Sequence, residues 1–215
     1  MKIAIIGTGN VGSALGSSLA RAGHEIVFAG VDTRKAADVA AKLGATAVAS
    51  PVEAASTADV IVLAVPFTVA EAVTAQIARA VRGKTLIDAT NPLRSDNSGL
   101  ATEGGPNGAE RIAAAAPDAR VVKAFNTLFA SVQAHPEAHG QVVDALYAGD
   151  DPGAKATVAQ LIRSIGLRPV DAGPISSARE LEAMAWLNIS LQLRTGGNWN
   201  SAFVLVGAPD KAVIA

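Results

Sequence analysis

Short apolar runs alternate along most of the chain with longer stretches in which apolar residues recur every three or four positions. The short runs predict buried strands, and the longer stretches, most of which stop at a glycine, predict helices. The predicted strands are Lys2–Ile6, Glu25–Ala29, Ala58–Val65, Thr85–Asp88, Arg120–Phe125, Gln141–Ala148 and Arg168–Asp171. The predicted helices are Val11–Ala22, Arg34–Leu43, Val69–Val81, Ala109–Ala116, Pro152–Ile165 and Ser177–Leu193.

This alternation predicts right-handed βαβ units and a mainly parallel sheet in an α/β protein. Half of the residues are apolar but only 4% are aromatic, so Ala, Val, Leu and Ile must build the core. Such a core is typical of a doubly wound sheet with helices on both faces. We expect a main domain over residues 1–150. Residues 151–215 contain a helix, a strand and a helix, and we expect them to form a small α/β lobe packed on that domain.

The segment Gly7-Thr8-Gly9-Asn10-Val11-Gly12 has the spacing G-x-G-x-x-G, follows the first predicted strand and opens the first predicted helix. In a dinucleotide-binding turn of the Rossmann type, the first glycine permits the tight turn. The second lets the backbone approach a pyrophosphate, and the third lets the helix pack close to the strand. The pyrophosphate then lies at the positive end of the helix. A structural glycine turn is the alternative, but the order strand, turn, helix favours a dinucleotide site made of these six residues.

The end of the second predicted strand decides between NAD and NADP in such folds. An acidic residue there binds the ribose hydroxyls of NAD, and an arginine accommodates the 2′-phosphate of NADP. The sequence at this place is Gly30-Val31-Asp32-Thr33-Arg34-Lys35. Asp32 suits NAD, whereas Thr33, Arg34 and Lys35 suit NADP. Asp32 or Thr33 could instead cap the helix that follows, so the residues alone leave the nucleotide undecided.

Three further strand ends should face the ligand, because ligands of open α/β sheets bind at the carboxyl ends of strands. They are Ala64-Val65-Pro66-Phe67, Asp88-Ala89-Thr90-Asn91-Pro92 and Lys123-Ala124-Phe125-Asn126-Thr127. The first is apolar and suits a ribose. The second lies where a nicotinamide should arrive, and the third ends on polar residues that suit polar recognition. The alternative for each is a plain loop of turn-forming residues.

Charge and composition exclude several other function classes. Lys and Arg total 18, and Asp and Glu total 19, which offers no basic footprint for nucleic acid or an anionic membrane. The sequence has no cysteine, so disulfides, thiolate metal sites and cysteine nucleophiles are excluded. His135 and His139 are four residues apart, but Pro136 follows the first, and we expect no metal there. Apolar runs are too short for a bilayer or a signal peptide, so we expect a cytoplasmic protein.

Five segments, spread over nearly the whole chain, together resemble one family. They are Met1–Gly12, Ala64–Pro66, Asp88–Leu93, Val122–Thr127 and Leu181–Asn188. In combination they resemble the NADPH-dependent deazaflavin (coenzyme F-420) reductases. Countless dehydrogenases share the glycine loop, whereas the combination of Asn-Pro-Leu with Lys-Ala-Phe-Asn-Thr is much more specific.

The resemblance implies a Rossmann domain with a small carboxy-terminal lobe. It also implies hydride transfer between C4 of the nicotinamide and C5 of a deazaflavin, with NADP as cofactor, NAD as the alternative nucleotide, and the deazaflavin as second substrate. By that likeness the glycine loop holds the pyrophosphate and Val65-Pro66 flank the ribose. Asn91-Pro92 and the backbone of Ala124-Phe125-Asn126 fix the nicotinamide, and the deazaflavin lies between these strand ends and the lobe.

The chain departs from that family's pattern directly after the second predicted strand. The family usually has Ser-Arg after the second strand to hold the 2′-phosphate, and this chain has Gly30-Val31. NADP preference then requires that Thr33, Arg34 or Lys35 replaces the absent arginine.

Hydride transfer between two ring systems depends mainly on holding the two carbons at reactive distance, so we assign no catalytic side chain. One alternative is a reductase of a small ketone or imine. It needs a proton donor, for which only Lys123 and Tyr147 come into consideration, and a long helical domain for which residues 151–215 are too few. The other alternative is a non-catalytic dinucleotide-sensing module. The apolar segment Ala202–Val206 suggests a homodimer, unless it covers the sheet edge.

Overall fold

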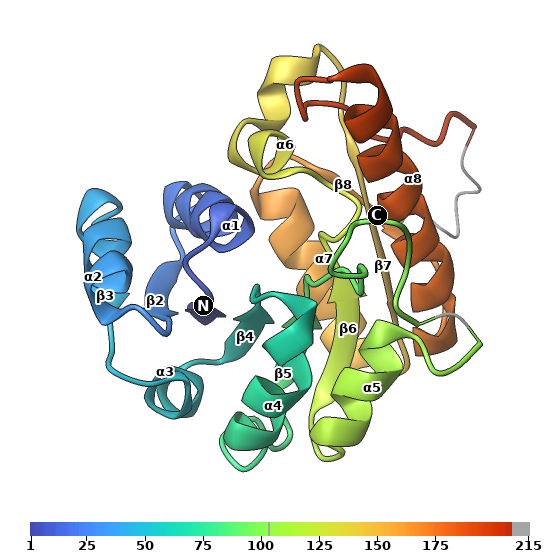
Figure 1. The fold of residues 1–215 in the computed structure, drawn as a ribbon. Coiled ribbons are helices and arrows are strands. Elements are labelled where there is room, and N and C mark those ends of the chain that lie inside the picture. The colour runs from blue at the N-terminus through green and yellow to red at the C-terminus, as the bar shows by residue number, and fades with distance from the viewer. Residues whose placement is uncertain (103, 208–215) are drawn as a thin grey trace.

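The computed structural model describes residues 1–102 and 104–207, and its central sheet is covered by helices on both faces (Figure 1). The strands are β1 (Lys2–Ile6), β2 (Glu25–Ala29), β3 (Thr46–Ala47), β4 (Val60–Leu63), β5 (Thr85–Asp88), β6 (Arg120–Ala124), β7 (Asp144–Gly149) and β8 (Arg168–Asp171). The helices are α1 (Asn10–Arg21), α2 (Thr33–Lys42), α3 (Pro51–Thr57), α4 (Phe67–Ile77), α5 (Gly108–Ala115), α6 (Ala130–Ala134), α7 (Pro152–Ser164) and α8 (Ala178–Thr195). Two 3₁₀ turns, η1 (Pro136–His139) and η2 (Ile175–Ser177), complete the described elements.

The eight strands form one sheet in the order β3-β2-β1-β4-β5-β6-β7-β8. All neighbouring strands in this sheet are parallel except β6 and β7. The first six strands follow the order 3-2-1-4-5-6 of the Rossmann fold, which places the ligand crevice at their carboxyl ends. The predicted α/β class and the mainly parallel, doubly wound sheet are therefore confirmed.

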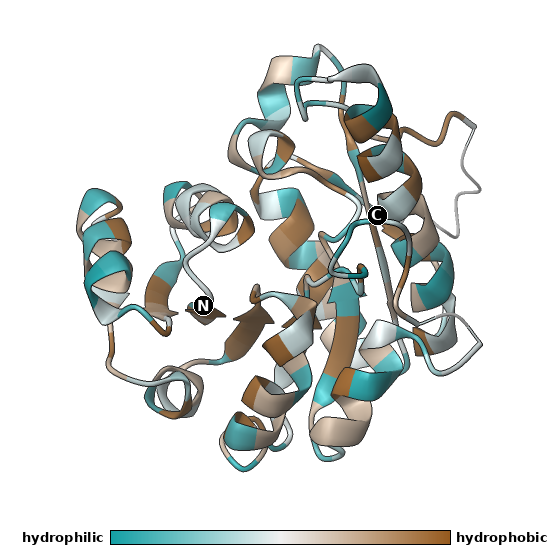
Figure 2. Cartoon of the chain, viewed as in Figure 1, coloured by the Kyte–Doolittle hydropathy of each residue, from teal (hydrophilic) through white to brown (hydrophobic). Residues whose placement is uncertain are grey.

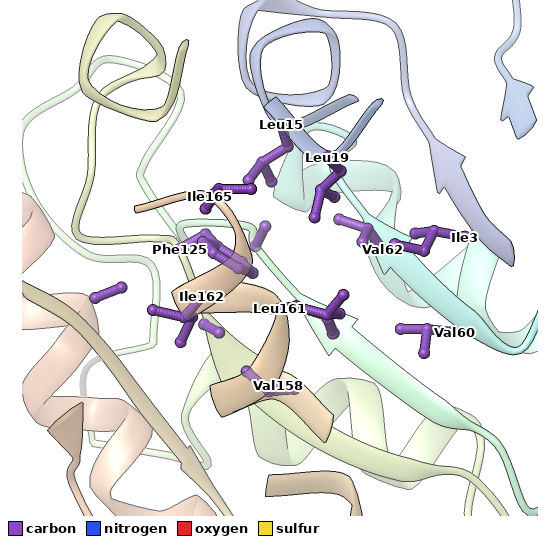
Figure 3. Close-up of a cluster of buried hydrophobic side chains, with 14 of the residues drawn as sticks. Ile3, Leu15, Leu19, Val60, Val62, Phe125, Val158, Leu161, Ile162 and Ile165 are labelled. Carbon is purple, nitrogen blue, oxygen red and sulfur yellow. The ribbon is translucent and has the colours of Figure 1, made fainter. Parts of the chain in front are cut away.

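Two apolar clusters fill the space between the sheet and the helices. One lies beneath α1 and α7, and the other beneath α3, α4 and α5. Figure 3 shows the first, where Ile165, the residue after α7, lies near Leu15 of α1, and Leu19 of α1 lies near Val62 of β4. The central strands β1 and β4 are among the most hydrophobic segments of the chain (Figure 2). As the composition predicts, aliphatic side chains make up most of this core.

Several short elements were not predicted from the sequence. The strand β3 and the helices α3 and α6 have two, seven and five residues, too few for an apolar period to stand out. Predicted ends also differ: α4 begins at Phe67 and ends at Ile77, and β7 begins only at Asp144. The segment 202–206 forms no strand and runs beside the start of β7, where the Leu205 amide donates to Asp144.

The reversal at β7 determines the course of the last helix. Because β7 runs antiparallel to β6 and β8 runs parallel to β7, the chain leaves β8 away from the carboxyl ends of β1, β4, β5 and β6. Helix α8, red in Figure 1, then runs back along β7 beside α5 and ends near α6. No helix of the described residues is both long enough and apolar enough to cross a membrane.

Candidate functional site

A pocket of about 590 Å³ lies at the carboxyl ends of β5 and β6, between the start of α1 and the length of α8. This volume is in the range of small-molecule sites. Its walls come from α1, the loops after β5 and β6, the start of α6, α8 and the loop after α8. The lining residues are Asn10, Val11, Asn91, Leu93, Asn97, Asn126, Thr127, Leu128, Phe129, Ala130, Ser131, Ala185, Ile189, Leu193, Asn198 and Trp199.

The glycine loop leads into this pocket, and its three glycines have different surroundings. Gly7 has φ +117°, and a Cβ there would lie 2.3 Å from the carbonyl oxygen of Ala64. A Cβ on Gly12 would lie 2.0 Å from the carbonyl oxygen of Gly7. Gly9 is different, because no heavy atom of the described residues lies within 4 Å of a Cβ built there. Gly7 and Gly12 are therefore required by packing, whereas the space at Gly9 is open for a ligand.

The amino terminus of α1 carries no side-chain cap from the described residues. Gly9 is the N-cap, and the first turn has no acidic residue. The side chains of Asp32, Ser50, Asn107 and Asp151 cap α2, α3, α5 and α7, whereas α4, α6 and α8 resemble α1 in having no side-chain cap from the described residues. The first backbone N–H groups of a helix need an acceptor, and an uncapped glycine-rich start provides a place for an anion. This arrangement fits the pyrophosphate of a dinucleotide.

The loop after β6 has an unusual backbone that buried side chains hold in place. Phe125 has φ +65°, a left-handed conformation that is rare for a bulky residue. The buried amide of Gln133 donates to the carbonyl oxygens of Phe125 (3.0 Å) and Leu128 (2.8 Å). The hydroxyl of Ser18 on α1 donates to the carbonyl oxygen of Gln133 at 2.6 Å. The loop that lines the pocket is thus fixed to the helix that follows the glycine loop.

Asn91 and Asn126 join the ends of β5 and β6 by two hydrogen bonds between their amide groups and backbone. Asn91 Nδ2 donates to the Asn126 carbonyl oxygen, and Asn126 Nδ2 donates to Asn91 Oδ1, both at 3.0 Å. Asn126 Nδ2 also donates to the carbonyl oxygen of Leu181 on α8. Asn126 Oδ1 and Thr127 Oγ1 are buried with no partner in the described residues. Both residues line the pocket, and an acceptor beside a hydroxyl suits a carboxamide such as that of nicotinamide.

The far wall of the pocket is aromatic and consists of Phe129, which precedes α6, and Trp199, which lies in the loop after α8. The rings of Phe129 and Trp199 meet edge to face, with 5.3 Å between their centroids. The Trp199 amide donates to Gln192 Oε1 at 3.0 Å, and its carbonyl oxygen accepts from the Ser131 hydroxyl at 2.5 Å. Ser201 is bound in turn to Asn188 of α8. These bonds hold Trp199 at the pocket although 41% of its surface is exposed.

Asp32, which follows β2, caps the helix after it, as one of the two interpretations of this residue predicted. Its carboxylate accepts from the Lys35 amide at 3.0 Å and so caps α2. Val31 is fully exposed, and Thr33 and Arg34 are exposed beside it. A Cβ on Gly30 would lie 3.2 Å from Thr8 Oγ1, so the Thr8 hydroxyl of the glycine loop reaches this strand end.

The structure thus places the predicted site residues in a row along one sheet edge. Of these residues, Asn10, Val11, Asn91 and Asn126 line the pocket, whereas Pro92 and Ala124 are buried behind it. Residues 31–34 lie at the β2 end, and residues 64–66 follow β4 beside Gly7. Sequence reasoning missed the α6 start and the α8 face as pocket walls. A signal for the latter was present, because Ala185, Ile189 and Leu193 recur at a helical spacing of four.

The two side chains considered as proton donors, Lys123 and Tyr147, are both fully buried, and neither lines the pocket. Lys123 Nζ donates to Asp88 Oδ2 at 2.9 Å and to the Thr90 carbonyl oxygen at 2.7 Å. Burial, with a smaller contribution from the charge of Asp171, raises the pKa of Tyr147 to about 12. The two groups are therefore poorly placed to protonate a ketone or imine, which weakens that alternative.

Comparisons with known proteins identify the family of the chain. A family model described as "NADP oxidoreductase coenzyme F420-dependent" matches residues 2–92. The chain is 35% identical to the F420-dependent NADP reductase of Methanothermobacter marburgensis, over 90% of this chain and 93% of that protein. It is 37% identical to the enzyme of the same name from Methanothermobacter thermautotrophicus, over 90% of each.

A crystal structure of a candidate F420-dependent NADP reductase from Arthrobacter sp. FB24 superposes with a TM-score of 0.84. The two sequences are 29% identical, and the match covers 95% of this chain and 99% of that one. The chain therefore belongs to the family of coenzyme F420-dependent NADP oxidoreductases.

Proposed function

We propose that the chain transfers a hydride between NADP(H) and the deazaflavin F420, with both reacting rings held in the pocket at the ends of β5 and β6. One observation carries this proposal. One pocket joins the uncapped start of α1 to two side-chain oxygens that have no partner in the described residues, Asn126 Oδ1 and Thr127 Oγ1, and to an aromatic wall at Phe129 and Trp199. Such a pocket suits a dinucleotide on one side and a second planar ring on the other.

When both are bound, the nicotinamide exchanges a hydride at C4 and the deazaflavin exchanges it at C5. The chain's own residues bind the two molecules and orient their rings. The backbone of Gly7–Gly12 holds the pyrophosphate, and Ala64-Val65-Pro66 flank the ribose. Asn91 and Asn126, supported by Pro92 and Ala124 behind them, hold the nicotinamide carboxamide. Two observations support these roles: the open space at Gly9, and Asn126 Oδ1, an acceptor with no partner in the described residues.

No side chain is assigned a proton-transfer role, because a hydride passes directly between two rings that are stacked at reactive distance. The apolar lining from Ala185, Ile189 and Leu193 excludes water from the space between the rings. The chain therefore contributes by positioning the two rings and excluding water, and not by acid–base chemistry.

The direct test mixes purified full-length protein with NADPH and F420 and follows the absorbance of both. We expect oxidation of NADPH to match reduction of F420 one to one, and the reverse from NADP⁺ and reduced F420. Binding of NADPH without any turnover would overturn the proposal in favour of a dinucleotide sensor.

The residues that select NADP over NAD form the second part of the proposal. We infer that Thr8, Thr33 and Arg34 bind the 2′-phosphate in place of the Ser-Arg pair that the family usually has. Arg34 is exposed at the first turn of α2, and the Thr8 hydroxyl lies beside Gly30 at the same strand end. Asp32 is engaged as the cap of α2, and Val31 offers no polar group.

Replacing Arg34 with Ala tests this inference. A hydrogen bond to a charged group contributes about 1.5–3 kcal/mol, so the ratio of kcat/KM for NADPH to that for NADH should fall at least ~10-fold. Lys35→Ala is the matched control, since it removes a neighbouring exposed cation, and it should change the ratio less. An unchanged ratio in Arg34→Ala would show that another group holds the phosphate.

We propose further that residues 1–150 form the dinucleotide domain and that the lobe from residue 151 onward supplies the acceptor side of the pocket; its last residues, 208–215, lie outside the described residues.

We also propose that the protein is cytoplasmic and forms a homodimer. The absence of cysteine and the use of two small-molecule redox partners support the cytoplasmic location. Exposed Leu187 and Leu191 on α8 support the homodimer. Light scattering on the purified protein measures the oligomeric state.

A further inference from the structure

A cluster of three ionisable side chains is buried beneath the pocket, and no part of the proposed chemistry uses it. Lys123 of β6, Asp88 of β5 and Glu182 of α8 are each at most 1% exposed. Lys123 Nζ lies 2.9 Å from Asp88 Oδ2 and 3.1 Å from Glu182 Oε1. Lys123 Nζ donates to Asp88 Oδ2 and to the Thr90 carbonyl oxygen, the latter at 2.7 Å, and its charge is paired with Glu182.

The cluster connects α8 to the two strand ends of the pocket. Asp88 Oδ1 accepts from the amide and hydroxyl of Thr90, the residue before the pocket-lining Asn91. Glu182 Oε2 accepts from the Gly108 amide at the start of α5. The residue before Glu182, Leu181, accepts from the side chain of Asn126. One lysine and one carboxylate thus fix the helix where it crosses the polar residues of the pocket.

Glu182 also lies on the face of α8 that lines the pocket. Ala185, Ile189 and Leu193 follow it at spacings of three, four and four, which is one side of a helix. The other end of this face is held by the bonds of Gln192 and Asn188 to the following loop. Glu182 is therefore the anchor at the start of the pocket wall.

We propose that Glu182 is a positioning residue: through Lys123 it sets the distance of the α8 wall from Asn91 and Asn126, and so the position of the acceptor ring. This inference rests on the proposed function for the identity of that ring. The buried lysine and carboxylates lose hydration on folding, a cost that favourable pairing only offsets. Their use here is to hold one helix in one place.

The variant Glu182→Gln tests this without changing the side-chain size. Glu182 Oε1 is ion-paired with Lys123 Nζ at 3.1 Å, and Glu182 Oε2 accepts from the Gly108 N–H. An amide has one acceptor and one NH₂ group, so either orientation sets N–H against N–H. We expect KM for F420 to rise about five- to ten-fold, a shift of roughly 1–1.4 kcal/mol, while the Kd for NADPH stays within about two-fold and kcat changes less than KM.

Asp171→Asn is the matched control. Asp171 Oδ1 also accepts from one lysine, Lys155 (2.8 Å), and from one glycine amide, Gly173 (2.8 Å), and none of the three lines the pocket. It should lower the melting temperature without changing KM for F420. If Glu182→Gln raises KM no more than this control does, Glu182 serves stability alone and the proposal is wrong.

Gly108→Ala is a second variant that keeps every charge. Its Cβ would lie 2.6 Å from Glu182 Oε1, so it displaces the same carboxylate, while alanine is otherwise favoured over glycine in a helix by about 1 kcal/mol. It should raise KM for F420 in the same direction, and it keeps the test open if Glu182→Gln does not fold.

A readout that needs no turnover separates this inference from the proposed function. The chain has two tryptophans, so Trp186→Phe leaves Trp199 of the pocket wall as the only one. In that background Glu182→Gln should increase acrylamide quenching of Trp199, and Asp171→Asn should not. Absent turnover in the unmodified protein overturns the proposed function; equal quenching in the two variants overturns the positioning role.

Discussion

The two sides of the pocket are built in opposite ways. The dinucleotide side consists of backbone from six consecutive residues, 7–12, in which two glycines avoid collisions and one leaves an open space. The acceptor side consists of side chains from distant segments, such as Phe129, Ile189 and Trp199; the rings of Phe129 and Trp199 meet edge to face, and a hydrogen bond to Gln192 holds Trp199. Local sequence specifies the first side, whereas only the folded chain assembles the second. The two sides should therefore respond differently to substitution.

The largest effect is expected at Gly12 on the dinucleotide side. In Gly12→Ala the Cβ would lie 2.0 Å from the Gly7 carbonyl oxygen and 3.3 Å from Ile5 Cγ2. Because backbone cannot give way as a flexible side chain can, we expect a loss of roughly 2 kcal/mol or more in unfolding free energy together with loss of NADPH binding. Urea denaturation and NADPH titration measure the two. Unchanged stability would mean that the loop does not need its close packing.

Gly9→Ala should separate binding from folding on that same side. Gly9 has φ −75° and ψ −170°, which any residue adopts, and its Cβ meets none of the described atoms within 4 Å. The unfolding free energy should stay within about 0.5 kcal/mol. NADPH affinity should nevertheless fall at least ~10-fold, about 1.4 kcal/mol, since the methyl group occupies the space proposed for the pyrophosphate. Wild-type affinity in this variant would place the pyrophosphate elsewhere.

The smallest effect is expected at Trp199 on the acceptor side. Trp199→Ala removes the edge-to-face contact with Phe129, and aromatic contacts of this kind contribute about 0.5–1.5 kcal/mol. We expect KM for F420 to rise roughly three- to ten-fold and the Kd for NADPH to stay unchanged. Trp186→Ala removes the other tryptophan, which does not line the pocket, and should leave both values as they are. A change confined to NADPH would reverse the assignment of the two sides.

The same contrast explains what the sequence could predict. The sheet and its long helices follow from apolar periods that lie within one element, and the glycine loop follows from a spacing of six residues. Helix α6, with five residues, has no such period, and its position depends on Gln133 and Ser18, which meet only in the folded chain. The left-handed Phe125 could not be predicted either, because glycine rather than phenylalanine is the usual sign of that conformation.

For the site, the sequence identified Asn91 and Asn126 but gave no role to Glu182, and it considered Lys123 as a proton donor. A lysine in an apolar strand has two interpretations, a functional amine or a buried ion pair. Only the positions of Asp88 and Glu182 decide between them, and these residues are 94 positions apart in the chain. Contacts over such separations leave no periodic trace in one sequence.

The antiparallel pairing of β6 with β7 makes the acceptor side exchangeable. Because the chain turns over at β7, residues 172–207 return along one face and reach the pocket last. A recombinant chain that takes the sequence after Asp171 from a relative would carry a new acceptor wall and an unchanged nucleotide loop. Such a graft has one covalent junction, and its fit depends on whether the incoming helix brings a carboxylate for Lys123.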